Sequence, residues 1–338
     1  MYKYLREDVK KLKAYQVNET KYKIKLDANE GIDWMDGLNK YPDDTCKSLR
    51  EKLGERLNKK PSEFLIGNGS SELIGYTMNA YLETGETVLS IWPTFSMYEI
   101  YTIINKGKYR KFPLKDMVDL DVTAFIDLAK ESKAKLVIIS NPNNPTGTVI
   151  SMEDIRRIIS SLDAMVILDE AYIEFSDLPL EDYTREFENL IVLRTFSKAM
   201  ALAGIRLGYM IAHENTIDCV NRIRSPYNVN TLTQDVGIKA LDKQEEIDKN
   251  IQMVKSERER MRSYMESKGY RPLPSQGNFL FFKGSKDLGS KLANKGVLIR
   301  GFGGDLEGYY RLTIGTVEEN NGFIKVFEEV LNETERSY

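Results

Sequence analysis

Four short, almost continuous runs of apolar residues stand out between residues 88 and 193. Apolar residues at consecutive positions, rather than at alternate ones, are typical of strands buried on both faces of a parallel sheet. Stretches with helical spacing separate the runs, such as residues 151–161, which have Glu153 and Asp154 in the first turn. The pattern predicts an α/β fold with a mostly parallel sheet sandwiched by helices. The runs are Val88 to Ile91, Leu136 to Ile139, Met165 to Leu168 and Leu190 to Leu193.

A polar, turn-forming segment follows each of these runs. In open parallel sheets, ligands bind beyond the carboxyl ends of the strands. The sequence therefore predicts a functional site at that edge, before any particular motif is considered. The segments are Pro93-Thr94-Phe95, residues 141–147, residues 169–172 and residues 194–198.

The last third of the chain has a different pattern. Residues 244–268 are strongly charged, with apolar residues at helical spacing and Gly269 as the stop, which predicts one long amphipathic helix. Apolar runs at Phe279 to Phe282, Val297 to Ile299 and Leu312 to Ile314, then a helix near residues 318–332, predict a second, smaller α/β domain. We predict an N-terminal arm and part of the small domain at 1–30, a large domain at 31–235 and a small C-terminal domain at 236–338.

Charge and composition narrow the class of protein. The net charge of the 338 residues is −3, from 48 Lys and Arg against 51 Asp and Glu, which is too balanced for affinity to nucleic acid through phosphate neutralisation. No apolar stretch is long enough to span a membrane, and the first residues are polar and lysine-rich. Cys46 and Cys219 fit neither a disulfide framework nor a metal site. We expect a cytoplasmic protein without a metal, a nucleic-acid partner or a membrane partner.

The single histidine, His213, limits the chemistry. It follows an apolar run and is most simply a loop residue, so catalysis must use lysine, carboxylates, tyrosine or a cofactor. Asp169 and Lys198 each follow a predicted core strand, and adjacent strands would bring them to one crevice. A lysine there can bond covalently to an aldehyde cofactor, and a buried carboxylate can keep a pyridine nitrogen protonated. Taken alone, Lys198 can be a surface lysine, and Asp169 can be a helix cap at the end of a strand.

The surrounding motifs decide between these interpretations. In their combination and order, the chain resembles the fold-type I pyridoxal-phosphate-dependent aminotransferases of class II, and most closely the histidinol-phosphate aminotransferases. The matching segments span almost the whole chain. They are Leu26-Asp27-Ala28-Asn29-Glu30, Tyr41-Pro42-Asp43, Gly67-Asn68-Gly69-Ser70-Ser71-Glu72, residues 141–147, Asp169-Glu170-Ala171-Tyr172, Thr195-Phe196-Ser197-Lys198 with Arg206, and Tyr310-Arg311-Leu312.

The resemblance implies a seven-stranded, mostly parallel sheet in the large domain and pyridoxal 5′-phosphate as cofactor. It implies that Lys198, Asp169 and Tyr172 are catalytic, with Lys198 carrying the cofactor and Asp169 holding its ring nitrogen. Other side chains would hold the phosphate, stack on the ring or bind its phenolic oxygen. The implied cofactor-binding residues are Ser70, Ser71, Phe95, Asn144, Asp169, Tyr172, Thr195, Ser197, Lys198, Arg206 and, from a neighbouring subunit, Tyr41.

For the substrates, the resemblance implies an amino donor and a 2-oxo acid, bound through Tyr15, Asn29, Arg300 and Arg311. Two converging arginines suit a phosphate dianion, which favours transfer from histidinol phosphate to 2-oxoglutarate. A homodimer is implied, with Tyr41 reaching the neighbouring active site. An aromatic amino acid aminotransferase or a phosphothreonine decarboxylase would share the cofactor residues. A non-catalytic cofactor-binding sensor is a more distant alternative.

Overall fold

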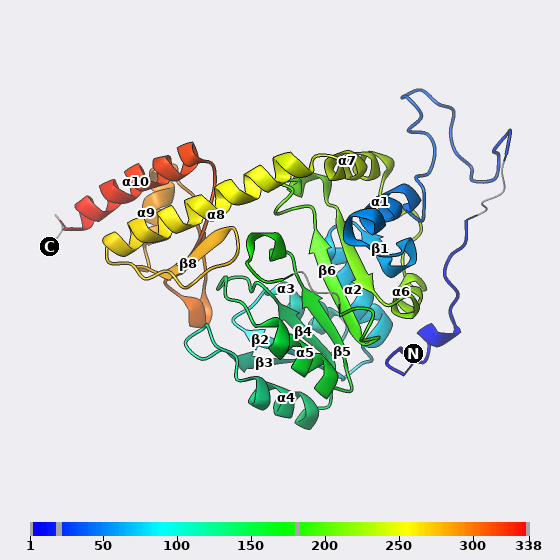
Figure 1. The fold of residues 1–338 in the computed structure, drawn as a ribbon, viewed down its shortest axis with the longest axis horizontal. Helices are drawn as coiled ribbons and strands as arrows, with labels where there is room; N and C mark the ends of the chain where they lie inside the picture. Colours follow the sequence, from blue (N-terminus) through cyan, green and yellow to red (C-terminus); the bar gives the residue numbers. More distant parts are fainter. Residues whose placement is uncertain (1–2, 18–21, 180–182, 336–338) are drawn as a thin grey trace.

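A seven-stranded sheet forms the centre of the larger part of the molecule (Figure 1). The computed structural model describes residues 3–17, 22–179 and 183–335. The strands lie in the order β1-β7-β6-β5-β4-β2-β3, and β7 alone is antiparallel to its neighbours. They are β1 (Phe64–Gly67), β2 (Thr87–Trp92), β3 (Lys108–Pro113), β4 (Ala134–Ser140), β5 (Met165–Asp169), β6 (Leu190–Thr195) and β7 (Gly208–Ala212).

The four predicted strands are confirmed as β2, β4, β5 and β6. Their continuous apolar character has the expected cause, because both faces of the sheet are covered by helices. On β4, for example, Leu136 and Ile138 belong to one hydrophobic cluster, and Val137 and Ile139 belong to the other. The helices of this part are α1 (Lys47–Leu57), α2 (Ser70–Tyr81), α3 (Met97–Ile104), α4 (Val122–Glu131), α5 (Met152–Ser161), α6 (Glu214–Asn221) and α7 (Thr231–Leu241).

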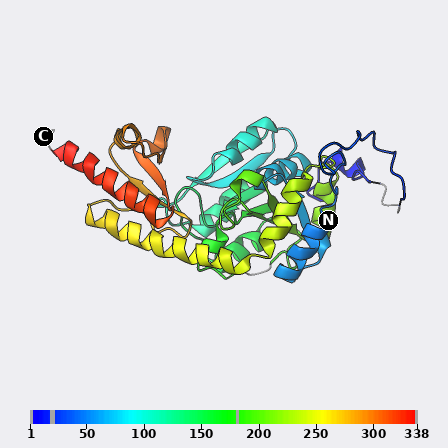
Figure 2. The same ribbon diagram turned by 90° about the horizontal axis from the view of Figure 1, so that it is seen from above.

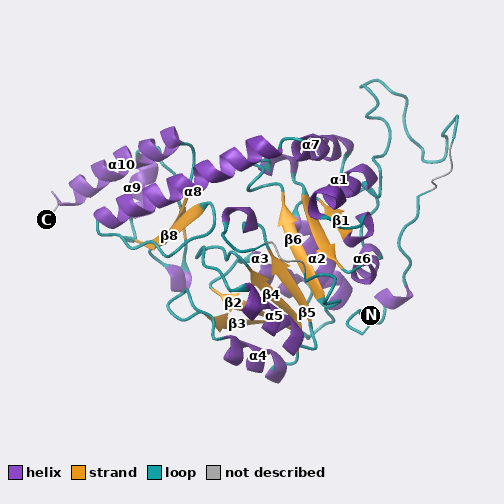
Figure 3. Ribbon diagram, viewed as in Figure 1, coloured by secondary structure: helices purple, strands orange, loops and turns teal. Residues whose placement is uncertain are grey.

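A long helix, α8 (Gln244–Ser267), leads from the large sheet to a second, three-stranded antiparallel sheet at the far end of the molecule (Figure 2). Figure 3 shows the two groups of strands apart from one another, with α8 running past both. A separate hydrophobic cluster holds the small sheet against its helices. This part contains β8 (Phe279–Lys283), α9 (Leu288–Asn294), β9 (Arg300–Gly301), β10 (Tyr309–Thr313) and α10 (Val317–Glu335).

One predicted strand is wrong in position. Residues 297–299 are not a strand; β9 begins at Arg300 and pairs with β10 through Arg300 and Arg311. The N–H of Val297 donates to the carbonyl oxygen of Leu292, which ties this segment to the end of α9. Leu298 is 86% exposed. The apolar run therefore connects a helix to a strand instead of forming one.

The first described residues pack beside the large sheet. Leu5 and Val9 are buried in the cluster that contains α2, α3 and α6, and the N–H of Arg6 donates to the carbonyl oxygen of Ala80. We expected part of 1–30 to join the small domain. Leu5 and Val9 are instead buried against the large domain. The division at residue 235 stays a prediction. No helix within the described ranges is long and apolar enough to cross a bilayer.

Candidate active site

A cavity of about 230 Å³ opens where β4, β5 and β6 end, at the edge predicted from the sequence. Every residue predicted to bind a cofactor lines it, with the exception of Tyr41. Arg311 lines it as well, together with three side chains that the sequence did not single out, Tyr98, Ser140 and Ala171. The cavity thus collects residues on or next to α2, α3, β4, β5, β6, β7 and β10, separated by up to 241 positions, from Ser70 to Arg311.

Lys198 lies just beyond the end of β6, and its Nζ is 5.4 Å from the centre of the Tyr172 ring. Burial lowers the pKa of Lys198, and the positive charges of Arg311 and Arg206 lower it further. A lowered pKa increases the fraction of neutral amine, which is the form that can act as a nucleophile or accept a proton. The surroundings of Lys198 therefore suit covalent and acid–base chemistry better than a structural ion pair.

Asp169 ends β5, the strand beside β6, and is 5% exposed. The hydroxyl of Tyr98 donates to its Oδ2 at 2.6 Å, and the N–H of Ala171 donates to its Oδ1 at 3.1 Å. Burial raises the pKa of Asp169, while these two hydrogen bonds lower it. A carboxylate held in this way can accept a further hydrogen bond from a positively charged N–H in the cavity.

Donors of hydrogen bonds for an anion gather at the other side of the cavity. Ser70 and Ser71 begin α2, whose first N–H groups and dipole favour negative charge. A Cβ on Gly69, which has a φ of +81°, would lie 2.8 Å from Nη2 of Arg206, so the glycine leaves room for the guanidinium. No carboxylate in the described ranges pairs with Arg206. With the hydroxyls of Thr195 and Ser197, this donor set fits a phosphate group.

The position of α2 depends on a second glycine. Gly208, the first residue of β7, lies so close to the start of α2 that a Cβ there would be 2.4 Å from the backbone nitrogen of Ser70. Any larger residue would push the helix end away from the sheet. The close approach explains how the first N–H groups of α2 come to face the same cavity as Lys198.

Arg311 lies on β10 and reaches the cavity from the small sheet. Its Nη1 donates to Oδ1 of Asn144 at 2.5 Å, and its guanidinium lies 5.4 Å from the centre of the Phe279 ring. Burial lowers the pKa of Arg311. Burial raises the pKa of Tyr172 to about 12, although the positive charge of Arg311 acts to lower it. Arg311 has no carboxylate partner among the ion pairs of the described residues, so its charge is available to an anionic ligand.

A second cavity of about 520 Å³ adjoins the first and shares Phe95, Asn144 and Arg311 with it. Arg300 lines this adjoining cavity, and its positive charge contributes to lowering the pKa of Arg311. Arg300 and Arg311 therefore both line this adjoining cavity, which Ser70 and Arg206 do not line.

Three predicted residues do not line either cavity. Asn29 is exposed, and Tyr15 and Tyr41 are 54% and 55% exposed. Tyr41 stacks on Tyr227 at 4.5 Å between ring centres, and Tyr15 meets Tyr227 edge-on at 6.3 Å. Tyr227 was not predicted from the sequence, although an aromatic residue in a polar loop was a usable signal.

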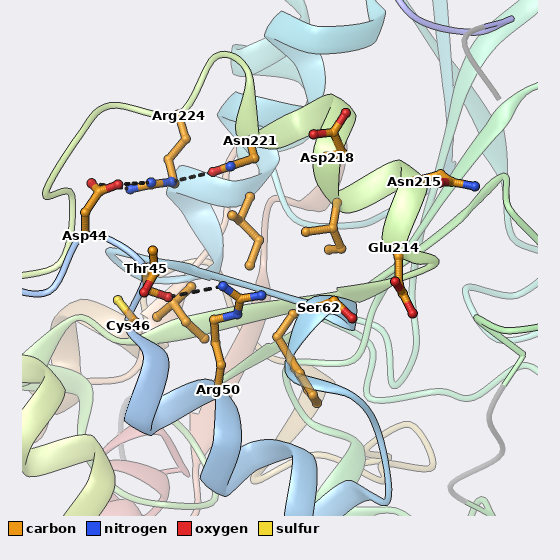
Figure 4. A pocket seen from close by; sticks show the side chains of 14 residues that line it. Asp44, Thr45, Cys46, Arg50, Ser62, Glu214, Asn215, Asp218, Asn221 and Arg224 are labelled. Carbon is orange, nitrogen blue, oxygen red and sulfur yellow. Dashed lines mark hydrogen bonds and ion pairs between the residues drawn. The ribbon is translucent and has the colours of Figure 1, made fainter. Parts of the chain in front are cut away.

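Another cavity, of about 360 Å³, lies between α1, the edge strand β1 and α6 (Figure 4). Its arginines are engaged with the protein itself. Arg224 forms a buried ion pair with Asp44 at 2.6 Å, and Arg50 donates to the carbonyl oxygen of Pro61 at 2.7 Å. None of the predicted site residues lines this cavity, so we place the chemistry in the cavity around Lys198. In the part of the chain that the structure describes, no cluster of His, Cys, Asp and Glu could hold a metal ion.

Comparison with known proteins shows the family and agrees with the fold. The family model for aminotransferase class I and II matches residues 11–327, and the chain belongs to this family.

Individual relatives of the chain have a more specific name than the family. The chain is 37% identical to a histidinol-phosphate aminotransferase of Caldanaerobacter subterraneus subsp. tengcongensis, over 97% of this chain and 99% of the relative. The crystal structure of the histidinol-phosphate aminotransferase from Clostridium acetobutylicum is similar, with a TM-score of 0.80, 25% identity and coverage of 88% of this chain and 92% of that one. The enzyme from Sinorhizobium meliloti, solved in complex with pyridoxal-5′-phosphate, has the same fold, with a TM-score of 0.80, 24% identity and coverage of 86% and 84%.

Proposed function

We propose that this aminotransferase uses pyridoxal 5′-phosphate to move the amino group of histidinol phosphate to 2-oxoglutarate, giving imidazole-acetol phosphate and glutamate. The observation that carries the proposal is the distribution of charge around the two adjoining cavities. Arg206 and the start of α2 form one anion site, Lys198 and Asp169 lie beyond it, and Arg311 and Arg300 form a second anion site. A phosphorylated cofactor and a phosphorylated substrate together need two such sites.

The cofactor would be held by residues already described. Ser70, Ser71, Thr195, Ser197 and Arg206 would bind its phosphate, and Phe95 would stack on its pyridine ring. When bound, pyridoxal phosphate supplies an aldehyde that bonds covalently to amines and a ring that accepts the electron pair left when a Cα–H bond breaks.

The side chains of the protein then supply the proton chemistry. The amine of Lys198 would take the proton from the Cα of the amino donor and deliver it to C4′ of the cofactor, and would move a proton in the opposite direction when the 2-oxo acid is converted. Asp169 would accept a hydrogen bond from the ring nitrogen and keep that nitrogen protonated. The hydroxyl of Tyr172 would donate to the phenolic oxygen. Asn144 would donate to it through Nδ2, because its Oδ1 already accepts from Arg311.

The choice of substrate depends on the second anion site, and replacing Arg300 tests it. We expect Arg300→Ala to lower kcat/KM for histidinol phosphate by about 2 kcal/mol, or about 30-fold, the lower end of the range for removing one partner of a charge pair. The lower end applies because Arg300 is exposed in the described conformation. For an amino donor without a phosphate, the same replacement should cost far less.

Measuring both donors on both proteins gives a two-by-two comparison, in which the coupling of arginine to phosphate is separated from general damage. Replacing Lys286, an exposed small-domain residue paired with Glu307, with alanine provides the control. Equal losses on both donors would contradict a phosphate site at Arg300. A native protein that prefers phenylalanine or tyrosine to histidinol phosphate would instead identify an aromatic aminotransferase.

We also propose that the active form is a homodimer in the cytoplasm. Residues 22–41 project from the body of the molecule on the side opposite the small sheet, and their apolar side chains are open to water (Figure 1). Exposed apolar surface of this extent is typical of an interface between subunits. Glu30 orders the segment by accepting from the Tyr41 N–H and pairing with Lys25 and Lys40. The exposed apolar residues are Tyr22, Ile24, Leu26, Ile32, Trp34, Met35, Leu38 and Tyr41.

Mixed dimers test whether Tyr41 acts in the neighbouring site. A Lys198→Ala subunit has no functional site of its own but can supply Tyr41 to its partner's site. A Tyr41→Ala subunit keeps Lys198 but cannot supply the tyrosine. If Tyr41 reaches across the dimer, co-expression of the two weakly active variants should restore about one quarter of the native activity, from one complete site in half of the dimers. Activity that is no higher than the average of the two separate variants would show that Tyr41 does not act across subunits.

A further inference from the structure

Tyr98 lines the active-site cavity but has no role in the sequence motifs or in the proposed reaction. Its side chain is fully buried, and its hydroxyl makes the 2.6 Å hydrogen bond to Oδ2 of Asp169. We propose that Tyr98 is a positioning residue for the amino-transfer reaction, holding Asp169 charged and turned toward the ring nitrogen of the cofactor. This inference rests on the proposed function, because it assumes that Asp169 faces that nitrogen.

The hydrogen bonds that Asp169 accepts within the protein leave some acceptor sites of its carboxylate unused. An ionised carboxylate can accept about four hydrogen bonds, two on each oxygen. Tyr98 uses one site on Oδ2, and the Ala171 N–H uses one site on Oδ1. The two donors approach different oxygens and so fix the rotation of the carboxylate about its last bond. Asp169 lines the cavity, so an N–H of a bound ring can reach its remaining acceptor sites.

Tyr98 is itself held firmly. It lies in the first turn of α3, and its backbone carbonyl accepts a hydrogen bond from Oγ1 of Thr102 at 2.7 Å. Its ring meets Phe95 edge-on at 5.5 Å between ring centres. The proposed ring-stacking residue and the carboxylate are thereby linked through one tyrosine, so Tyr98 can set the position of the pyridine nitrogen relative to Asp169.

In the hydrogen bond between Tyr98 and Asp169, the electrostatic surroundings keep the proton on the tyrosine hydroxyl. Burial raises the pKa of Tyr98 well above 10, and the charge of Asp169 raises it further, so the phenol keeps its proton and donates. Burial raises the pKa of Asp169, and the Tyr98 hydrogen bond opposes this rise. The other groups that act on Asp169 are Glu170, which raises its pKa, and Lys198, which lowers it. Without the phenol, the buried carboxyl would bind a proton more readily and compete with the ring nitrogen for it.

Replacing Tyr98 with phenylalanine removes one oxygen atom and keeps the ring. We expect kcat to fall about 10- to 100-fold, the loss expected for a hydrogen bond to a charged group, with KM for the amino donor within about twofold of the native value. Tyr81→Phe is the matched control, because Tyr81 is also a fully buried tyrosine but lies outside the cavity. Thermal melting of both variants reports on folding.

The decisive measurement is the protonation of the cofactor itself. Both variants and the native protein would be loaded with pyridoxal phosphate labelled with ¹⁵N in the ring, and the ring nitrogen would be followed by NMR as the pH is raised. The native protein and Tyr81→Phe should keep the nitrogen protonated over a wide range, whereas in Tyr98→Phe the proton should be lost at a pH at least about one unit lower. A purely structural role for Tyr98 would not change this titration.

A double replacement separates action through Asp169 from other effects. In an Asp169→Asn protein, the further change Tyr98→Phe should lower kcat by less than about threefold, because the group through which it acts is already altered. Native titration in Tyr98→Phe, or fully additive losses in the double variant, would overturn the proposal. If the native protein itself showed no protonated ring nitrogen, the role of Asp169 in the proposed function would fail first, and the inference about Tyr98 with it.

Discussion

Replacing Lys198 with alanine is expected to lower kcat at least about 10³-fold, because it removes both the covalent attachment point and the base that moves the Cα proton. The proposed phosphate contacts of Ser70, Ser71 and Arg206 do not involve this side chain, so the variant should still bind the cofactor. Turnover of histidinol phosphate and the visible absorbance of the bound cofactor measure the two effects separately. The exposed Lys286→Ala protein again serves as the control.

A chemical label identifies the lysine directly. Borohydride reduction of the loaded native protein, followed by peptide mapping, should place the cofactor on the peptide that contains Lys198. Among the lysines of the described residues, Lys198 is the one that lines the cavity with Asp169, which is why we expect a single labelled site. A label on any other lysine would contradict the assignment.

Replacing Asp169 with asparagine should produce the second largest loss, about 10²- to 10³-fold in kcat, comparable to the loss of a preorganised charge contact to the reacting system. Asparagine has nearly the same shape and can still accept from Tyr98 or Ala171, so the fold should be kept. It has no negative charge, however, and cannot hold a proton on the ring nitrogen. The step that breaks the Cα–H bond should slow most, because it depends on the protonated ring.

A deuterium isotope effect shows which step has slowed. With an amino donor deuterated at Cα, the isotope effect on kcat should be larger for Asp169→Asn than for the native protein, since proton removal would then limit the rate. Unchanged single-turnover rates in this variant would mean that another carboxylate faces the ring. Glu170 is the neighbouring candidate, but its side chain pairs with Arg194 at 2.8 Å.

The sequence alone was sufficient for four strands of the large sheet, β2, β4, β5 and β6, and for the edge at which the candidate site lies. Apolar runs such as Leu136 to Ile139 have no polar face, and a strand without a polar face must be covered on both sides, which leads to a parallel sheet between helices. The polar segments after these runs then lie at one edge, where the structure places Asn144, Asp169 and Lys198 around one cavity. Their proposed roles came from motif order, because local pattern does not distinguish a cofactor lysine from a surface lysine.

The tertiary structure alone decided the contacts between distant segments. The bond from Tyr98 to Asp169 joins residues 71 positions apart, and it depends on where α3 starts above the sheet, which no local pattern encodes. Likewise, Arg300 begins a strand instead of following one, because pairing with Arg311 stabilises Arg300 while the apolar residues before it are tied to α9. Apolar periodicity reports which side of a segment is buried, but not which partner buries it. Tyr15 and Tyr41 lie outside the cavity and contact Tyr227 instead, a partner from a distant part of the chain that no local pattern indicates.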